Sequence, residues 1–470
     1  MCDRDDENIM WGKCVKNNIS EKEINKIDFL FVYEHPEREL ESIMLIGENL
    51  TKRGFKVEYY YRDSDILFPR EYFGNVKVIA VPFLYSETDL YEVVYRIAGE
   101  VDSIVDLRWE QIYKKSVESD DNAFWYPKGE AKAAKHICWG MQTKENLIRV
   151  GVKEEDAVVL GCSTMDYLRP ELSSYFLNKE ELWGKYGLDV NSETVMFISS
   201  FSNVNVSKET INHMYQVMGK DKYDAFRENS IKSQKTILSW LLKLADKGYK
   251  IIYRPHPNEK ISEEIKNINN DNFVVIGEYA VKQWLRNVDY VFTWISTTYA
   301  ECNLAGIPCG ILNPYKYDAE DEMSIFEDAK KIDSYDKMLD FIELVKINGM
   351  VETDEVIKRY FERDEIPAYI KTADYMEKLI KEQIFYPWNR EIKDKFMARK
   401  EAEQRWIDKM LENHEKYATA TNKGGALKAL AGIYKKDYVF IEEKMEARRR
   451  QQDNAMEKEK EIIRKKIAHI

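Results

Sequence analysis

Short apolar runs alternate with amphipathic segments along most of this chain, and this alternation constrains its fold more than any other feature. An order of strand, helix, strand predicts a parallel sheet that is covered by helices on both faces. We therefore expect an α/β, Rossmann-like domain over residues 27–180, after an N-terminal extension at 1–26. Its expected strands are Ile27–Tyr33, Phe55–Tyr61, Val76–Pro82, Ser103–Asp106, His136–Trp139 and Ala157–Gly161, with helices at Glu39–Arg53, Glu87–Ala98 and Thr143–Val150.

The same alternation restarts after a polar, turn-rich stretch at 167–186 and predicts a second Rossmann-like domain over residues 181–385. Two domains also suit the length of 470 residues, because single cores stop growing near roughly 250–300 residues. Beyond about residue 330 we expect helices and no further strand. The second set of expected strands is Thr194–Ser200, Lys250–Tyr253, Phe273–Ile276, Val288–Trp294 and Pro308–Leu312, and the late helices are Tyr335–Ile347, Glu352–Arg363 and Ala368–Gln383.

Residues 386–470 are expected to form a helical, charged C-terminal extension. Residues 390–418 continue as a charged helix, and a breaker follows at Thr419–Gly425. Lys444–Lys466 holds nine basic and five acidic residues, a local charge of 9 − 5 = +4 on a chain of net charge −12. We expect a solvated helix here. The alternative is a basic arm that makes a peripheral contact with anionic lipid or with a partner.

Composition excludes several classes of protein. A net charge of −12 is a poor match for nucleic acid. Neither a secretory signal nor an apolar stretch of about 18 residues is present, so we expect a cytoplasmic protein, with the inner face of the membrane as a peripheral location. The six cysteines form no C-x-x-C pair and are expected to be reduced and buried. No cofactor or metal motif occurs, and the Asp63-Ser64-Asp65 pair lies in a loop and is assigned no metal.

Two Rossmann-like halves predict a cleft at the carboxyl ends of their strands, where open parallel sheets bind ligands. In the second half, a strand runs into Arg254-Pro255-His256-Pro257. The two prolines prevent a helix from starting at His256, so its imidazole is held rigidly where it can donate to a phosphate oxygen, and Arg254 adds positive charge.

Two further loops of the second half carry polar groups. Ser296, Thr297 and Thr298 follow an apolar strand and open a short helix, which offers free N–H groups, hydroxyls and a favourable dipole to a phosphate. Glu301 is too far along to complete a capping box with Ser296, so its carboxylate is expected to bind ribose hydroxyls. The loop at 199–205 supplies Ser200 and Asn203 as weaker candidates, because Ser and Asn also make ordinary turns.

In the first half, Glu34 and His35 follow the first strand and are candidate bases. Arg38 and Glu39 begin the next helix and are candidates for acceptor binding. Asp106 and Glu110, after the fourth strand, offer a second pair of carboxylates, as a less favoured base and a further acceptor contact. The alternative is that these acids only complement helix dipoles.

These segments resemble bacterial surface-carbohydrate proteins, of capsule and lipopolysaccharide biosynthesis, with the GT-B glycosyltransferase architecture. They are more distantly similar to the CDP-glycerol glycerophosphotransferases of teichoic acid synthesis. The resemblance spans roughly residues 27–315. Its motifs are Tyr253–Glu259, Asp289–Pro308, Cys138–Gly140, Leu160–Arg169 and Arg38–Glu39.

The resemblance implies that His256 and Ser296–Thr298 contact the phosphates of a nucleotide-sugar donor and that Glu301 sits near the nucleotide. It also implies that the first domain holds the acceptor, a carbohydrate or a lipid-linked molecule, and the catalytic acid or base. The sequence departs from related enzymes, because Ser296-Thr297-Thr298 replaces a Ser-Gly-Gly run and Thr293 stands where many retaining enzymes have a second Glu. The stereochemical outcome is therefore open.

The resulting hypothesis is a metal-independent glycosyltransferase of surface polysaccharide biosynthesis that needs no cofactor. Two alternatives stay open at this point. One is transfer of a polyol phosphate from a CDP-alcohol by the same fold. The other is a catalytically silent module that scaffolds a membrane assembly.

Overall fold

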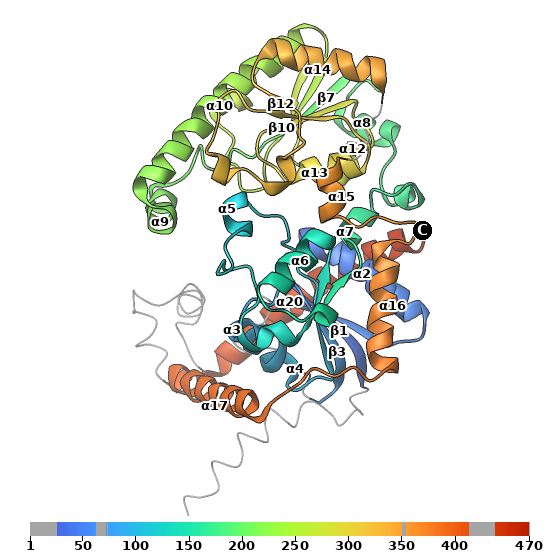
Figure 1. Cartoon of the computed structure of the whole chain (residues 1–470), viewed down its shortest axis with the longest axis vertical. Helices are drawn as coiled ribbons and strands as arrows, with labels where there is room; N and C mark the ends of the chain where they lie inside the picture. The colour runs from blue at the N-terminus through green and yellow to red at the C-terminus, as the bar shows by residue number, and fades with distance from the viewer. Residues whose placement is uncertain (1–25, 63–71, 73, 350–353, 413–437, 470) are drawn as a thin grey trace, which may run out of the picture.

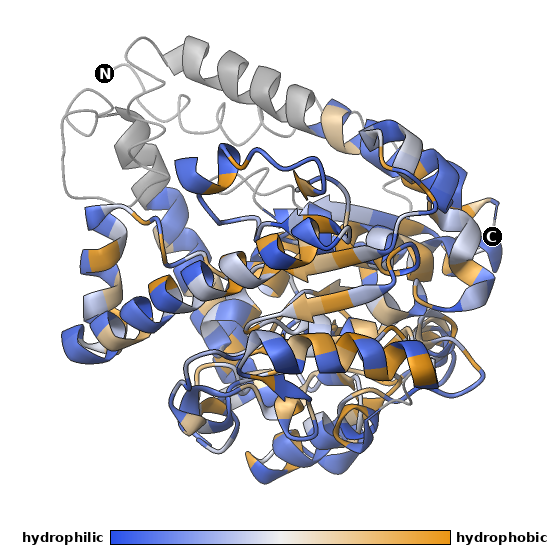
Figure 2. Cartoon of the chain, turned by 90° about the horizontal axis from the view of Figure 1, so that it is seen from above, coloured by the Kyte–Doolittle hydropathy of each residue, from blue (hydrophilic) through white to orange (hydrophobic). Residues whose placement is uncertain are grey.

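The computed structural model describes residues 26–62, 72, 74–349, 354–412 and 438–469. In 406–412 and 438–452 it describes the backbone alone. Residues 1–25 of the expected N-terminal extension lie outside the described residues, as do Asp63, Asp65 and the breaker at Thr419–Gly425. Within them the chain forms two sheets of six parallel strands each, stacked one above the other in Figure 1. The apolar strands lie between helices whose outer faces are hydrophilic, as Figure 2 shows. This arrangement confirms the predicted α/β class with two Rossmann-like domains.

The first sheet has the strand order β2-β1-β3-β4-β5-β6, and each neighbouring pair is parallel. Nearly all residues of β1, β3 and β4 are buried, as expected for strands that are covered on both faces. All six strands were predicted, with ends that differ by no more than two residues. The strands are β1 (Ile27–Tyr33), β2 (Val57–Tyr61), β3 (Val76–Val81), β4 (Ser103–Asp106), β5 (Lys135–Cys138) and β6 (Ala157–Val159).

The second sheet has the order β12-β11-β10-β7-β8-β9. Counted within the domain this is 6-5-4-1-2-3, the order of a dinucleotide-binding Rossmann sheet. The sequence pattern missed β12 because this edge strand is only two residues long. The strands are β7 (Thr194–Ile198), β8 (Lys250–Arg254), β9 (Phe273–Val275), β10 (Tyr290–Thr293), β11 (Cys309–Leu312) and β12 (Lys331–Ile332).

Helices cover both sheets and connect their strands. Around the first sheet lie α2 (Pro36–Lys52), α3 (Glu87–Asp89), η2 (Leu90–Tyr95), α4 (Arg96–Ala98), α5 (Lys115–Glu118), η3 (Gly129–Ala133), α6 (Met141–Arg149), η4 (Glu154–Asp156), α7 (Ser163–Asp166) and η5 (Pro170–Tyr175). Around the second lie α8 (Lys179–Tyr186), α9 (Lys208–Met218), α10 (Lys220–Asp246), α11 (Glu263–Lys266), α12 (Val281–Leu285), α13 (Thr298–Leu304), η6 (Ala319–Asp321), η7 (Ser324–Phe326), α14 (Tyr335–Asn348) and α15 (Glu355–Tyr360).

The predicted boundary between residues 180 and 181 falls inside α8. This helix belongs with the second domain, since Trp183 packs on Trp284 of α12, with ring centroids 5.8 Å apart. Asn178 caps α8 with a capping box, so the helix begins at a clear signal.

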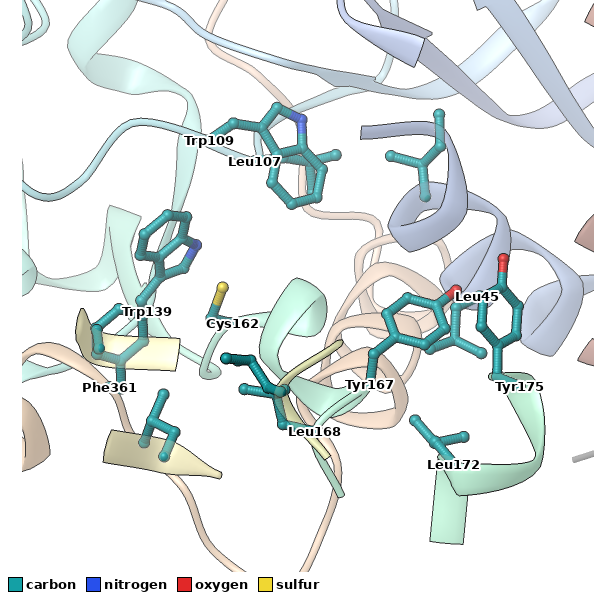
Figure 3. Packing of buried hydrophobic residues seen from close by; sticks show 14 of the residues in the cluster. Leu45, Leu107, Trp109, Trp139, Cys162, Tyr167, Leu168, Leu172, Tyr175 and Phe361 are labelled. Carbon is teal, nitrogen blue, oxygen red and sulfur yellow. The ribbon is translucent and has the colours of Figure 1, made fainter. Parts of the chain in front are cut away.

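The chain crosses back to the first domain after α15. Helix α16 (Ala368–Lys381) packs along α2, although we expected it in the second domain. Two glycines make room for this crossing. A side chain on Gly140 would collide with the backbone of residues 359–360, and one on Gly161, at φ +88°, would meet the Glu362 carbonyl. Trp139 then stacks on Phe361, 5.5 Å away (Figure 3).

The C-terminal extension also packs on the first domain. Helix α17 (Arg390–Glu412) places Phe396 in the core beneath Tyr91 and Tyr95. Helix α20 (Tyr438–Ile467) lies along α2. No described helix is both long enough and apolar enough to span a membrane.

One face of α20 contradicts the expectation of a fully solvated helix. Ile463 and Ile467 are buried, and Met456 packs against the same core. The buried Lys460 donates to the carbonyl of Tyr59 at 3.3 Å, and Arg464 pairs with Glu48 at 3.1 Å. The four residues 456, 460, 463 and 467 are spaced to form one stripe of a helix. Three apolar side chains and one lysine stem therefore suffice to hold the basic segment on the fold.

The carboxyl ends of the two sheets face each other. Lys114 and Lys115 follow β4, and they pair with Asp321 and Glu322, which follow β11, at 3.0 and 2.8 Å. The amide of Lys115 also donates to the carbonyl of Glu322 at 2.9 Å. Loops that follow strands of both domains thus meet, as a ligand site between two Rossmann-like domains requires.

Four of the six cysteines lie in the described residues, and none of these forms a disulfide. Cys138, Cys162 and Cys302 are buried, and Cys309 is partly buried. Burial raises the pKa of Cys138 and of Cys162 to about 12, so both thiols stay protonated at neutral pH. The prediction of buried thiols is confirmed for Cys138, Cys162 and Cys302, whereas Cys309 is only partly buried.

Candidate functional site

The switch point of the second sheet lies between β7 and β10, where the chain leaves in opposite directions along the sheet. The loops after these strands are joined, because the Ser200 hydroxyl accepts the amide N–H of Ile295 at 3.1 Å. Strand β8 adjoins β7 on the other side. The segments that carry Ser200, His256 and Ser296 therefore leave three adjacent strands at one edge of the sheet.

A network beneath the His256 loop fixes its shape. The Glu259 carboxylate accepts from the hydroxyl of Tyr253 at 2.7 Å and from the amide of His256 at 3.2 Å. The Tyr253 hydroxyl also lies 3.0 Å from the Ser199 hydroxyl, so the tyrosine joins Ser199 to the Glu259 carboxylate. Sequence reasoning missed this role of Glu259, although an acid three residues after the histidine was a visible signal.

The geometry defines the protonation state of His256. The amide N–H of Asn258 donates to Nδ1 of the imidazole at 3.1 Å, which leaves the proton of the neutral ring on Nε2. Desolvation by the surrounding protein lowers the pKa of His256 below its usual value, although the charge of Glu259 opposes this. The exposed ring is thus a neutral donor that presents Nε2–H at the sheet edge.

Arg254 is more constrained than predicted. Its guanidinium donates to the carbonyls of Glu278, at 2.8 Å, and Tyr279, which follow β9. Burial lowers the pKa of Arg254, while the nearby charge of Glu301 acts in the opposite direction. The side chain therefore ties two loops together and leaves positive charge close to Glu301.

The three hydroxyl residues before α13 differ in availability. Ser296 accepts the amide N–H of Thr298 at 3.3 Å and donates to its hydroxyl at 3.1 Å. Thr298 is buried, while Thr297 is exposed and makes no capping hydrogen bond at its N-cap position. Among the three side chains, Thr297 is the one that a ligand could reach without first breaking a hydrogen bond.

Glu301 and Asn203 flank this edge. One carboxylate oxygen of Glu301, Oε2, is buried without a hydrogen bond, and its nearest cation, Lys282, lies 3.8 Å away. Buried acceptors are normally satisfied, so this oxygen is suited to a ligand hydroxyl. The side-chain oxygen of Asn203 accepts from the Tyr223 hydroxyl at 3.3 Å. Lys282 had not been singled out from the sequence.

The first domain brings Glu34 to the carboxyl end of β1, the strand at its own switch point. Glu34 is partly exposed and forms an ion pair with Arg62, which follows β2, and its carboxylate lies 3.6 Å from Nε2 of His35. Arg62 had not been predicted, although its place directly after the neighbouring strand is the same signal that identified Glu34.

The candidates for acceptor binding fall into two kinds. Glu39 is fully buried; it accepts the amide N–H of Glu34 at 2.8 Å and pairs with Arg38 at 3.1 Å. It therefore holds the turn after β1 rather than facing solvent. Arg38 and Glu110 form an exposed ion pair with each other.

Asp106 lies in a different environment from Glu34. Its carboxylate is fully buried and meets His136 at 2.8 Å, the amide of Arg108 at 3.0 Å and the Arg108 guanidinium at 3.3 Å. All three side chains are inaccessible to solvent. This geometry stabilises the fold. A substrate cannot reach the Asp106 carboxylate, so the structure does not favour the catalytic role predicted for Asp106.

Among the described residues, no three His, Cys, Asp or Glu side chains are grouped so that they could hold a metal ion.

The chain matches no protein-family model and no curated protein. Similar solved structures include a UDP-GlcNAc 2-epimerase of Methanocaldococcus jannaschii in complex with UDP-GlcNAc and UDP. It is 12% identical, covers 76% of this chain and 99% of its own, and has a TM-score of 0.44. A variant of the wall teichoic acid polymerase TagF is 14% identical, covers 80% and 96%, and has a TM-score of 0.49. Nothing about activity follows from likenesses this distant.

The strand orders and the facing sheets described above decide the architecture. The fold is GT-B. In GT-B terms, the edge that carries His256 belongs to the C-terminal domain and the edge that carries Glu34 belongs to the N-terminal domain.

Proposed function

We propose that this protein is a glycosyltransferase that moves a sugar from a nucleotide-sugar donor to a carbohydrate or lipid-linked acceptor in surface polysaccharide biosynthesis. The observation that carries the proposal is the neutral His256, held by Asn258 and Glu259 with Nε2–H as its free donor at the switch-point edge of a Rossmann sheet. A rigid neutral donor at this place suits an anionic diphosphate.

The second domain would hold the donor. His256 Nε2–H and the exposed Thr297 hydroxyl would donate to the phosphates. The Glu301 oxygen that lacks a hydrogen bond would accept from ribose hydroxyls. Arg254 would contribute charge through its position, since two of its five N–H groups already donate to carbonyls. Ser200 and Asn203 would shape the loop between donor and sheet.

The first domain would hold the acceptor and the base. In the transfer step, an acceptor hydroxyl oxygen bonds to the anomeric carbon while the bond from that carbon to the diphosphate breaks. The nucleoside diphosphate takes the bonding electron pair, and Glu34 takes the hydroxyl proton. His256 would stabilise the charge that develops on the diphosphate. We favour Glu34 over Asp106 because Glu34 is accessible and Asp106 is enclosed by His136 and Arg108.

The leaving group tests the reaction class. Glycosyl transfer releases a nucleoside diphosphate, whereas transfer of a polyol phosphate from a CDP-alcohol releases CMP. Purified protein would be incubated with UDP- and GDP-sugars and with CDP-glycerol, and the nucleotides released would be separated by chromatography. Release of UDP or GDP that depends on His256 supports the proposal. Release of CMP alone would replace it by alcohol-phosphate transfer, and no release from any donor would leave a GT-B module without this activity.

A further inference from the structure

Four aromatic rings cluster beside the Glu34 edge of the first domain. They belong to Phe83 and Tyr85, which follow β3, and to Phe124 and Trp125, in the long connection between β4 and β5. We refer to these four residues as the aromatic platform. Phe124 is 66% exposed, which makes it more exposed than Phe385, Tyr315 or Tyr279. A single exposed ring is common at a protein surface, but a ring that joins others in a contiguous apolar patch is typical of a binding surface.

The rings of the platform are ordered against one another. Phe83 stacks on Tyr85 with a centroid distance of 5.4 Å, and Phe124 packs on Tyr85 at the same distance. Trp125 stands edge-on to both Tyr85 and Phe124, at 5.6 Å from each. These are favoured aromatic geometries, so the four rings hold one another in place. Tyr85 is buried at their centre, and Phe83, Phe124 and Trp125 form the accessible part of the platform.

A buried arginine supports the platform from below. Arg108 is inaccessible to solvent, and its guanidinium lies 5.7 Å from the centre of the Tyr85 ring and donates to the Trp125 carbonyl at 3.0 Å. Its φ of +47° is unusual for a residue with a side chain, and Asp106 holds it there. Arg108 therefore contacts both Tyr85 and Trp125 and fixes their positions relative to β4.

Polar groups border the platform on the side of the proposed base. The Arg62 guanidinium lies 5.3 Å from the centre of the Phe83 ring and also pairs with Glu34. Apolar ring faces and a charged pair that can bond hydroxyls thus stand next to each other. A sugar has the matching surface, because its axial C–H groups present a weakly positive face to aromatic rings while its hydroxyls bond at the rim.

We propose that the aromatic platform binds a sugar residue of the acceptor, with one ring face on Phe83 and Phe124 and a hydroxyl directed to the Arg62–Glu34 pair. This inference rests on the proposed function, and it adds that the acceptor has a pyranose ring next to the hydroxyl that reacts. A glycerol unit, which has no ring face, would not bind there.

Saturation-transfer NMR tests the platform without any transfer reaction. The probes are methyl β-D-glucopyranoside, methyl β-D-galactopyranoside and methyl N-acetyl-β-D-glucosaminide, with glycerol as the negative probe. At least one glycoside should receive saturation at H1, H3 and H5, which share one ring face. Phe83→Ala and Phe124→Ala should each weaken binding about 2- to 10-fold, the range that a lost aromatic contact explains. Phe124→Trp should restore the signal.

Phe385→Ala is the matched control, because Phe385 is also exposed, at 59%. It follows Ile384, whose carbonyl accepts from Ser103 at the start of β4, whereas the platform follows the carboxyl ends of β3 and β4. Its signals should equal those of the unaltered protein. The proposal is overturned if no glycoside gives a signal, if Phe124→Ala leaves the signals unchanged, or if glycerol binds equally well. Because the protein is tested without donor, sugar binding in a protein that releases no nucleotide would reject the proposed function alone. Nucleotide release without sugar binding would reject the platform alone.

Discussion

At the scale of single residues, the candidate site depends on groups that are held rather than free. His256 keeps a donor proton on Nε2 because Nδ1 is already occupied by the Asn258 amide. A neutral imidazole costs less to desolvate than a charged one, yet it still offers a directed N–H to a phosphate oxygen. Glu301 complements it with a carboxylate oxygen that the described residues leave without a hydrogen bond.

The pKa of the His256 imidazole should differ between the free and the nucleotide-bound protein. Its pKa should lie below the usual 6.5 in the free protein, because desolvation outweighs the charge of Glu259. A bound diphosphate should raise this pKa, so nucleotide affinity should increase as the pH falls below the bound-state value and level off below the free-state value. NMR titration of the imidazole with and without UDP measures both. A pKa that is unchanged by a bound nucleotide would place His256 away from the phosphates.

Neutralising each of the two candidate bases, Glu34 and Asp106, should have different effects on turnover and on stability. Glu34→Gln is expected to lower kcat by about 10²- to 10⁴-fold with an unchanged melting temperature, because the residue is accessible and its loss removes a proton acceptor. Asp106→Asn should instead destabilise the fold by about 3–5 kcal/mol, because it breaks a fully buried charge cluster. Kinetics and thermal unfolding of both variants decide this. A well-folded Asp106→Asn protein without turnover would make Asp106 the base.

At the scale of elements, hydrophobic alternation predicted strands well because a strand buried on both faces is almost continuously apolar. It failed for β12, because a strand of two residues is too short to show a hydrophobic pattern. It also could not show that α16 packs on the first domain instead of the second. The packing of the C-terminal extension on the first domain was harder to predict from the sequence, for a physical reason. Its burial stripe contains Lys460, whose apolar stem packs while its charge reaches the Tyr59 carbonyl, and a count of charges treats that residue as solvated.

Neighbouring isoleucines test the docking of α20. Ile463 is 3% exposed and Ile462 is 56% exposed. Ile463→Ala should destabilise the docked helix by about 2–5 kcal/mol, the usual cost of truncating a buried isoleucine, and should raise hydrogen exchange in α20. Ile462→Ala should change stability by no more than about 0.5 kcal/mol. Equal exchange in both variants would mean that the stripe does not hold the helix.

At the scale of the whole molecule, two sheets face each other, with the edge that carries His256 above and the edge that carries Glu34 below. The order of strands and the positions of polar loops after them predicted this arrangement, since the carboxyl ends of parallel strands share an edge. The partners of those polar groups could not be predicted. Arg62, Asn258 and Glu259 act through contacts with residues on other strands or across a turn, and sequence spacing does not encode those distances.

The most direct test of the account is nucleotide binding by the second domain. Thermal unfolding would be followed with UDP-, GDP-, CMP- and CDP-linked compounds for the unaltered protein, His256→Ala and His213→Ala, the last being an exposed histidine on α9. One class should stabilise the unaltered protein and His213→Ala by about 2.7 kcal/mol at a hundredfold excess over Kd. His256→Ala should need about tenfold or more ligand for the same effect. No stabilisation by any compound, or equal stabilisation of His256→Ala, would contradict the account.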